Sequence, residues 1–149
     1  MTAPAVFRVA DRAGTVLEPQ WLARAERVHR QLRPDLSTDY VSQMNGIFRE
    51  GGEMAVAVLD GEVAGVAVFR CFANTHVGRR FYVDDLVTDD SQRSTGVGHA
   101  LLSWLEQEAR ARGAGNIDLE SGTQRTRAHR FYFREGYFVT SFSFRKALG

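Results

Sequence analysis

The sequence predicts an α/β (α+β) fold, in which a mixed sheet that is antiparallel at its start carries helices on its faces. Two β-rich apolar runs, 54–59 and 63–69, flank Asp60-Gly61, and an Asp-Gly pair between two such runs is typical of a β-hairpin. Farther along, an expected strand at 81–88 is followed by an apolar stripe of helical spacing over 97–112 and then by another short strand. A hairpin first and helical crossovers later indicate a mixed sheet packed against helices.

The N-terminal part of the chain is predicted to begin with a loose end, a strand and a helix. Residues 1–5 are expected to be disordered, and a short strand is expected at 7–9. A helix is expected at 21–31, because apolar residues recur there at helical spacing. Pro34 ends this helix, since proline disrupts a helix interior.

A second helix is expected at 40–49. A residue among 37–39 would cap its start, and Gly51-Gly52 follow its last turn. After the hairpin, residues 70–80 are expected to form a polar connection, and the strand at 81–88 follows it.

The C-terminal part is predicted to alternate helices and strands. The helix at 97–112 carries arginines in its last turn, where cations suit the helix dipole, and Gly113 is a natural terminator. A short strand is expected at 116–120, a short helix at 128–134 and a final strand at 137–147.

Composition excludes several classes of partner. The 149 residues are expected to form a single domain. Nineteen Lys+Arg against 18 Asp+Glu give a net charge of +1, which disfavours a nucleic-acid partner or a membrane surface. The longest apolar run, 54–59, is far shorter than the ~20 residues that span a bilayer, and the N-terminus lacks a secretory pattern. Cys71 is the only cysteine, so a cytoplasmic location without disulfides is expected.

Several kinds of catalytic site are also disfavoured. The four histidines are scattered without metal-ligand spacing, so no metal is expected. The only lysine is Lys146, so the chain lacks the lysine of a P-loop, and a Schiff-base nucleophile would lie close to the C-terminus. The serine elbow pattern G-x-S-x-G does not occur.

The stretch 81–99 holds the clearest local signal for a binding site. A strand ends, a polar loop follows, and Arg93-Ser-Thr-Gly-Val-Gly98 opens a helix. The first turn of a helix presents unpartnered N–H groups and a partial positive charge, and glycines let a bulky anion approach the backbone. These residues predict a cradle for a diphosphate. The alternative is a strand–turn–helix junction whose glycines serve the turn alone.

A second motif narrows the fold. Ala128-His-Arg-Phe-Tyr132-Phe-Arg-Glu-Gly136-Tyr137 is a short helix with an aromatic face. Together with Arg93–Gly98, which matches Gln/Arg-x-x-Gly-x-Gly/Ala at the expected distance, it resembles the GNAT acetyltransferase superfamily. The resemblance covers at least residues 53–146. It implies a GNAT-like mixed, mostly antiparallel six- to seven-stranded sheet with helices on both faces.

The resemblance also implies which residues bind acetyl-CoA. Backbone groups at the end of the strand would bind the thioester carbonyl and the pantetheine arm, and the loop amides would bind the pyrophosphate. The implied cofactor-binding residues are Leu86, Val87 and Thr88 on the strand, Arg93, Ser94, Thr95, Gly96, Val97 and Gly98 in the loop, and His99 at the start of the helix. Tyr132 matches the tyrosine that often serves as general acid toward the departing thiolate. Arg125 stands where many members carry asparagine near the pantetheine arm.

The acceptor side of the site needs a group that helps to remove a proton from the acceptor ammonium. An alkyl ammonium has a pKa of about 10.4, so deprotonating it at pH 7 costs about 4.6 kcal/mol, part of which a positioned base or water relay supplies. Related amine acetyltransferases have an acid proposed as base at the position of Asp84, and we expect Asp84 to orient a water or the ammonium. Neighbouring strand residues point to opposite faces, so Asp84 and Asp85 are expected not to face one acceptor together. Asp85 and Glu120 are candidate acceptor-binding residues.

The sequence therefore predicts an acetyl-CoA-dependent N-acetyltransferase in which the acceptor amine attacks the thioester directly. Carboxylates cluster along the chain and favour a small cationic amine, such as a polyamine, an amino acid or an amino sugar; they are Asp84, Asp85, Asp89, Asp90 and Glu120. The alternatives are a protein or peptide amine as acceptor, a non-catalytic acyl-CoA-binding module, and a nucleotide-binding fold. A homodimer is also expected, because the final strand would offer an edge that a second copy covers.

Overall fold

The computed structural model describes residues 2–149, and the chain divides into two compact units, Met1–Asp118 and Leu119–Gly149. Strand β1 begins at Ala5, so the expected disorder is wrong for that residue, and Met1 lies outside the described residues. Residues 2–4 form neither helix nor strand. Among residues 2–149, no helix is both long and apolar enough to cross a membrane.

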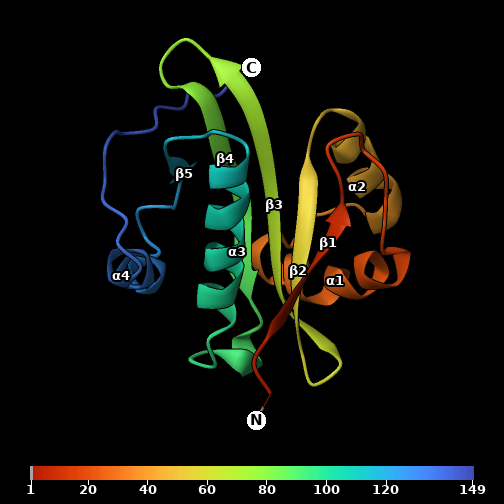
Figure 1. Cartoon of the computed structure of the whole chain (residues 1–149). Coiled ribbons are helices and arrows are strands. Elements are labelled where there is room, and N and C mark those ends of the chain that lie inside the picture. The colour runs from red at the N-terminus through yellow and green to blue at the C-terminus, as the bar shows by residue number, and fades with distance from the viewer. Residues whose placement is uncertain (1) are drawn as a thin grey trace. The chain divides into compact units, whose positions relative to one another are not determined.

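The sheet has five strands in the order β1-β2-β3-β4-β5, as Figure 1 shows. The strands from β1 to β4 pair antiparallel with their neighbours, and helix α3 connects β4 to β5. The predicted fold class is confirmed, whereas the six or seven expected strands are five. The strands span β1 Ala5–Ala10, β2 Glu53–Leu59, β3 Glu62–Asn74, β4 Gly78–Thr88 and β5 Ile117–Leu119.

The hairpin between β2 and β3 confirms the Asp-Gly prediction. Asp60 has a φ of 52° and Gly61 a φ of 80°. Both central residues of a type I′ turn need positive φ, and this turn matches the twist of the strands that it joins.

The polar connection expected at 70–80 is mostly strand, because β3 and β4 extend through it to a short turn. The guanidinium of Arg70 lies 5.3 Å from the ring centroid of Phe72 and 5.4 Å from that of Tyr82. Arg80 lies 4.8 Å from the Tyr82 ring. Polar composition suggested a loop, but these residues stabilise an extended hairpin through cation–π contacts.

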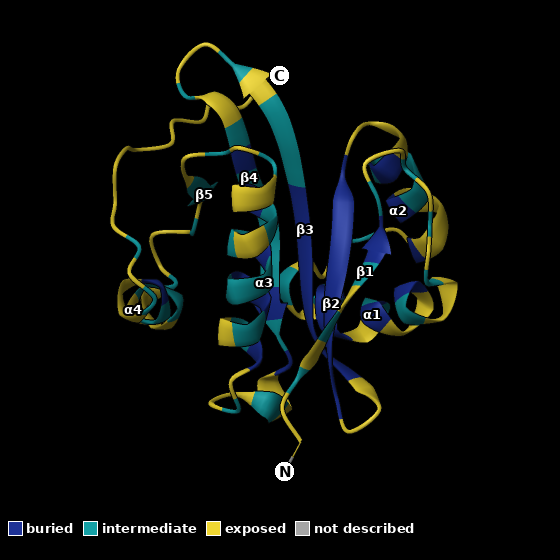
Figure 2. Cartoon of the chain, viewed as in Figure 1, coloured by how far each residue is buried: buried dark blue, intermediate teal, exposed yellow. Residues whose placement is uncertain are grey.

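Helices cover both faces of the sheet in the first unit. Helices α1, Pro19–Leu32, and α2, Tyr40–Arg49, pack on one face, where Val66 and Val68 of β3 join their apolar side chains in one core. Helix α3, Val97–Ala111, packs on the other face: a Cβ on Gly65 would come within 2.7 Å of Val97. Alternate residues of β3 therefore pack against α1 and α2 on one face and against α3 on the other. Strand β2 is buried along its length, as Figure 2 shows.

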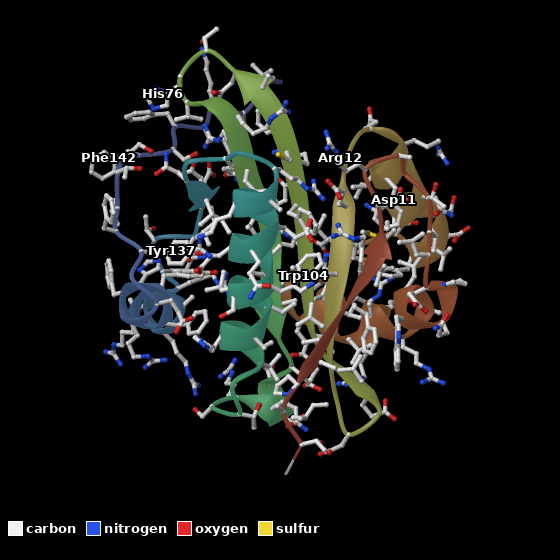
Figure 3. The ribbon with its side chains drawn as sticks, viewed as in Figure 1. Asp11, Arg12, His76, Trp104, Tyr137 and Phe142 are labelled. Atoms are coloured by element: carbon white, nitrogen blue, oxygen red, sulfur yellow. The ribbon has the colours of Figure 1, made fainter. Side chains whose placement is uncertain are left out.

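The second unit contains α4, Thr126–Arg134, followed by a segment without regular structure. The strand expected at 137–147 does not form. A strand needs a hydrogen-bonded neighbour, and residues 119–149 contain no other strand beyond the last residue of β5. The alternating apolar pattern remains exposed, and Figure 3 labels one of its members, Phe142; the exposed side chains are Phe138, Val139, Phe142, Phe144 and Leu148.

Candidate active site

Strand β4 contains a β-bulge at Asp84. Val68 of β3 pairs with Asp85, whereas the next residue, Phe69, pairs with Val83, so Asp84 is an extra residue on β4. A bulge breaks the alternation of side chains between the two faces of a sheet. The expectation that Asp84 and Asp85 face opposite sides rested on strict alternation, and it is wrong for this strand.

Asp85 lies on the sheet face that is covered by α1. Its Oδ2 lies 2.7 Å from Nε2 of His29, and its Oδ1 accepts hydrogen bonds from Nε and Nη2 of Arg33 at 2.9 and 2.6 Å. Burial by itself raises the pKa of Asp85, but the hydrogen bonds from His29 and Arg33 outweigh burial, and the pKa lies below its ordinary value. Asp85 is therefore ionised at neutral pH.

His29 is the buried part of this arrangement, since its side chain is only 1% exposed. Its Nδ1 lies 2.8 Å from the Tyr40 hydroxyl, and Tyr40 is buried as well. An ionised carboxylate can only accept, so His29 Nε2 carries the proton that is shared with Asp85. The imidazole, held at both nitrogens, fixes the position of the Asp85 carboxylate.

Asp84 is bound by two arginines. Its carboxylate accepts two hydrogen bonds from Arg70, at 2.7 and 2.8 Å, and its backbone oxygen accepts one from Arg33 at 3.2 Å. Arg70 follows Val68 by two residues and so lies on the same face of β3, which is the face under α1 and α2. The bulge thus places two carboxylates and two guanidinium groups together at one point of this face.

Asp89 fixes the loop that follows β4. The residue is 4% exposed, and its carboxylate accepts from Arg27 and Gln31 of α1 and from the Ser91 backbone, while its own N–H donates to the carbonyl of Ala64. The hydrogen bond from Arg27 is the main reason that the pKa of Asp89 is lowered to about 2. These contacts tie the short 3-10 turn Asp90–Gln92 to α1.

The glycine-rich loop ends in an open helix N-terminus. Ser94 and Gly96 have φ values of 63° and 85°, and Gly96 is the N-cap of α3. A Cβ on Gly96 would meet no other group within 4 Å, so space is open beside this backbone. The N–H groups of Val97, Gly98 and His99 occupy the first turn, where a helix gives them no internal partner. An anion can therefore approach them.

Charge in the same loop also fits a diphosphate. Arg93 is 45% exposed and donates from Nη2 to Asp90 at 2.5 Å, which leaves other guanidinium N–H groups for a phosphate. The hydroxyl of Thr95 donates to the carbonyl of Gln92 and closes the turn. Open backbone, a positive helix end and a guanidinium are the groups that a pyrophosphate requires.

Leu86, Val87 and Thr88 form the end of β4, directly after the bulge. Val87 is buried in the core under α1 and α2. Strand β5 has three residues against eleven in β4, so among residues 2–149 no strand lies along most of the β4 edge that faces away from β3. The backbone groups of an open edge are available to an extended ligand.

Tyr132 and Glu120 belong to the second unit. Tyr132 is 9% exposed, packs beside Phe131 and Tyr137 at ring-centroid distances of 5.5 and 5.9 Å, and has a pKa that burial raises. Its phenol is therefore protonated at neutral pH, as a general acid must be. Glu120 is exposed, and Arg125 is the N-cap residue of α4.

Sequence reasoning missed three residues of this site: His29, Arg33 and Arg70. A signal for one of them was present, since His29 continues the spacing of the buried Leu22 and Ala25 along α1. A histidine on the apolar stripe of a helix needs a polar partner, and its partner comes from a strand 56 residues later in the chain.

A model of the acetyltransferase (GNAT) family matches residues 18–137. The chain belongs to this family. The match includes both motifs that carry the resemblance, the loop Arg93–Gly98 and the helix that contains Tyr132. The comparison confirms GNAT membership, and the predicted fold class agrees with it.

Two curated N-acetyltransferases are similar to part of the chain. Aminoalkylphosphonate N-acetyltransferase of Salmonella typhimurium (strain LT2) is 38% identical over 94 residues, which are 62% of this chain and 61% of that protein. The uncharacterised N-acetyltransferase YhdJ of Bacillus subtilis (strain 168) is 43% identical over 72 residues, which are 48% of this chain and 51% of that protein. The matched region thus spans 51–61% of the length of these relatives.

A solved structure shows the same GNAT fold over nearly the whole chain. The aminoglycoside N-acetyltransferase AAC(6')-Iy, in complex with CoA, has a TM-score of 0.79 and 13% sequence identity, and the match covers 99% of this chain and 97% of that one.

Proposed function

We propose that the chain is an acetyl-CoA-dependent N-acetyltransferase that acts on the primary amine of a small molecule. The observation that carries this function is the open helix N-terminus at 93–98, directly after a strand end with a free edge. Membership of the GNAT family and a structural neighbour that was solved with CoA support the choice of cofactor.

Acetyl-CoA supplies an acetyl group activated as a thioester. The loop amides and Arg93 bind its pyrophosphate, the backbone of 86–88 binds the pantetheine arm and the thioester carbonyl, and His99 lies behind the pyrophosphate at the helix start. Asp84 orients the acceptor ammonium, whose proton passes to water. The amine nitrogen then forms a bond to the acetyl carbon as the carbon–sulfur bond breaks, and Tyr132 donates its proton to the sulfur. The nitrogen releases its surplus proton to water, and a proton from water restores the Tyr132 phenol.

The small-molecule acceptor is supported by the name of the Salmonella relative, an aminoalkylphosphonate N-acetyltransferase. Charge pairing bears on the kind of amine. Each acidic residue at 84, 85, 89 and 90 contacts an arginine; the pairs are Asp84–Arg70, Asp85–Arg33, Asp89–Arg27 and Asp90–Arg93. Pairing removes the net negative field that would attract a polycation. Among the expected acceptors, an amino acid therefore fits better than a polyamine, with Asp85 and Glu120 on the acceptor side.

The cofactor is tested by thermal unfolding with acetyl-CoA, CoA, ATP and NAD in parallel. A ligand at 100 times its Kd adds about 2.7 kcal/mol to the free energy of unfolding, so we expect the midpoint to rise with acetyl-CoA and with CoA. No rise with either form would contradict the cradle at 93–98. A rise with ATP or NAD alone would favour the nucleotide-binding alternative.

Catalysis is tested with Tyr132→Phe and Asp84→Asn. We expect both variants to bind CoA as the native chain does and to lower kcat, Tyr132→Phe by no more than about a hundredfold, because a thiolate is already a fair leaving group. Steady-state turnover on free amines and on peptides measures this. If the native chain is no faster than the variants on every amine, it is a non-catalytic acyl-CoA-binding module. Turnover on peptides alone would make it a peptide acetyltransferase.

A homodimer is part of this proposal as well. The alternating segment at 138–148 exposes large apolar side chains, and pairing with a second copy would cover them. Light scattering in solution gives the mass that decides between monomer and dimer.

A further inference from the structure

The cluster at the β4 bulge holds charges of both signs that remain partly open to ligands. Asp84 and Asp85 lie at the bulge, and Arg33 and Arg70 approach them from α1 and β3. The side chains of Arg33 and Arg70 are 52% and 43% exposed. The proposed function gives a role to the carboxylates alone and none to the guanidinium groups.

Each guanidinium uses only part of its donor set within the chain. Arg33 directs Nε and Nη2 to Asp85 and to the carbonyl of Asp84, and Arg70 directs Nε and Nη2 to the carboxylate of Asp84. In both arginines, Nη1 takes no part in these bonds and carries two further N–H donors. These remaining N–H donors of a positively charged group can bind an oxyanion such as a carboxylate or a phosphonate.

The carboxylates also keep capacity for an ammonium. Each carboxylate oxygen has two lone pairs, and among residues 2–149 the hydrogen-bond partner of Asp85 Oδ2 is His29, so this oxygen keeps a lone pair for a ligand. The His29 side chain is 1% exposed and its Nδ1 contacts the Tyr40 hydroxyl. The buried imidazole therefore holds the Asp85 carboxylate in place even if the exposed Arg33 side chain moves. Buried contacts therefore fix Asp85, whereas Arg33 and Arg70 stay partly exposed beside it.

We propose that the acceptor of this enzyme carries an anionic group a short carbon chain away from its primary amine, and that Arg33 and Arg70 bind that anion. The inference rests on the proposed acetyltransferase function and names the acceptor class of the same site. Both guanidinium groups contact Asp84, so a bound anion lies beside the carboxylate that orients the ammonium. A zwitterion matches this alternation of charge, whereas a diamine would place its second ammonium against the two arginines.

The test compares acceptors of one chain length that differ only at the far end. The probes are 4-aminobutyrate and 3-aminopropylphosphonate as anionic amines, propylamine as the neutral one and 1,3-diaminopropane as the cationic one. We expect kcat/KM for at least one anionic probe to exceed that for propylamine by at least tenfold, and 1,3-diaminopropane to be the poorest acceptor. The two anionic probes distinguish a carboxylate from a phosphonate. Equal or better turnover of the diamine would overturn the inference.

Variants test the two arginines. Arg33→Met and Arg70→Met are expected to lower the ratio of anionic to neutral acceptor kcat/KM by at least tenfold, and the ratio corrects for any effect on the position of Asp84. Arg110→Met, on the exposed last turn of α3, is the matched control and should leave the ratio within twofold. An unchanged ratio in both site variants contradicts the role of the arginines. If either methionine variant fails to fold, Arg33→Lys or Arg70→Lys replaces it. The comparison of the four acceptors with the native chain then still decides whether anionic amines are preferred.

The outcomes separate this inference from the proposed function. Turnover of propylamine with no preference for anionic amines leaves the acetyltransferase function intact and overturns the inference. No turnover of any amine, together with no thermal shift by acetyl-CoA, overturns the proposed function itself.

Discussion

Replacing Glu53 by alanine is expected to lower the free energy of unfolding by about 3 kcal/mol, because the largely buried Arg112 guanidinium loses its two shortest hydrogen bonds and, among residues 2–149, keeps only Glu108 as a carboxylate partner. Glu53 is 2% exposed and accepts two hydrogen bonds from Arg112, at 2.5 and 2.8 Å. The hydrogen bond to Glu53 is also the main reason that the pKa of Arg112 is raised. Urea unfolding at neutral pH measures the loss.

The double variant Glu53→Leu/Arg112→Met separates a charge effect from a packing effect. Removing both charges leaves Arg8 paired with Glu108, so most of the stability should return. Glu50→Ala, at an exposed position after α2, is the control and should change the free energy by about 0.5 kcal/mol or less. A double variant as unstable as Glu53→Ala would mean that packing around the aliphatic stems carries the effect. Arg112 also lies 5.8 Å from the ring centroid of Phe69 and 5.9 Å from that of Phe81.

The second large effect is expected at Asp89, where one substitution should lower both the stability of the chain and its affinity for acetyl-CoA. Asp89→Ala removes the acceptor for Arg27, Gln31 and Ser91, and should cost about 2 kcal/mol of unfolding free energy. The loop that leads into 93–98 then loses its tie to α1, so the Kd for acetyl-CoA should rise at least tenfold. Calorimetric titration with acetyl-CoA and urea unfolding measure the two effects. An unchanged Kd would show that α3 holds the loop without Asp89.

The stability of the chain should depend on pH through the ionisation of Asp89. The pKa of Asp89 is about 2 in the folded chain, below its ordinary value of 3.8. A lowered folded-state pKa means that the stabilisation is complete above the ordinary pKa and is lost as pH falls through about 2. Between pH 4 and pH 2 the free energy of unfolding of the native chain should therefore fall by about 1–2 kcal/mol through this residue. The loss is no larger because Arg27 is largely exposed and solvent weakens the ion pair. Asp89→Asn lacks this stabilisation at every pH, so its stability should not show this fall. Parallel curves for the two proteins would contradict this assignment.

Local signals were enough to predict most elements, including the glycine-rich start of α3. The hairpin at Asp60-Gly61, the helix at 40–49 and the loop at 93–98 each depend on turn residues and spacing within a few neighbours. The resemblance to the GNAT family came from motifs of the same local kind, and the family match agrees with it.

Features that depend on distant partners could not be predicted in the same way. Arg33 and Arg70 reach Asp85 and Asp84 across 52 and 14 residues, and neither pairing leaves a pattern in the sequence. The final strand was predicted from its alternation alone, but alternation describes which side chains would share a face and does not supply a neighbouring strand. The sequence-based argument for a cationic acceptor counted acids and could not count the arginines that neutralise them.

The bulge at Asp84 changes the phase of β4. Before it, odd-numbered residues face α3, since Phe81 stacks on Phe69 with ring centroids 5.2 Å apart and Phe69 contacts Trp104 of α3, which Figure 3 labels. After it, the odd-numbered Val87 lies in the core on the opposite side. The apolar residues of one parity, Phe81 before the bulge and Val87 after it, therefore serve different layers of the sheet. Deleting Asp84 would restore a continuous ladder, because Asp85 would then follow Val83 directly and still pair with Val68, and residues 86–88 would keep their partners and their layers.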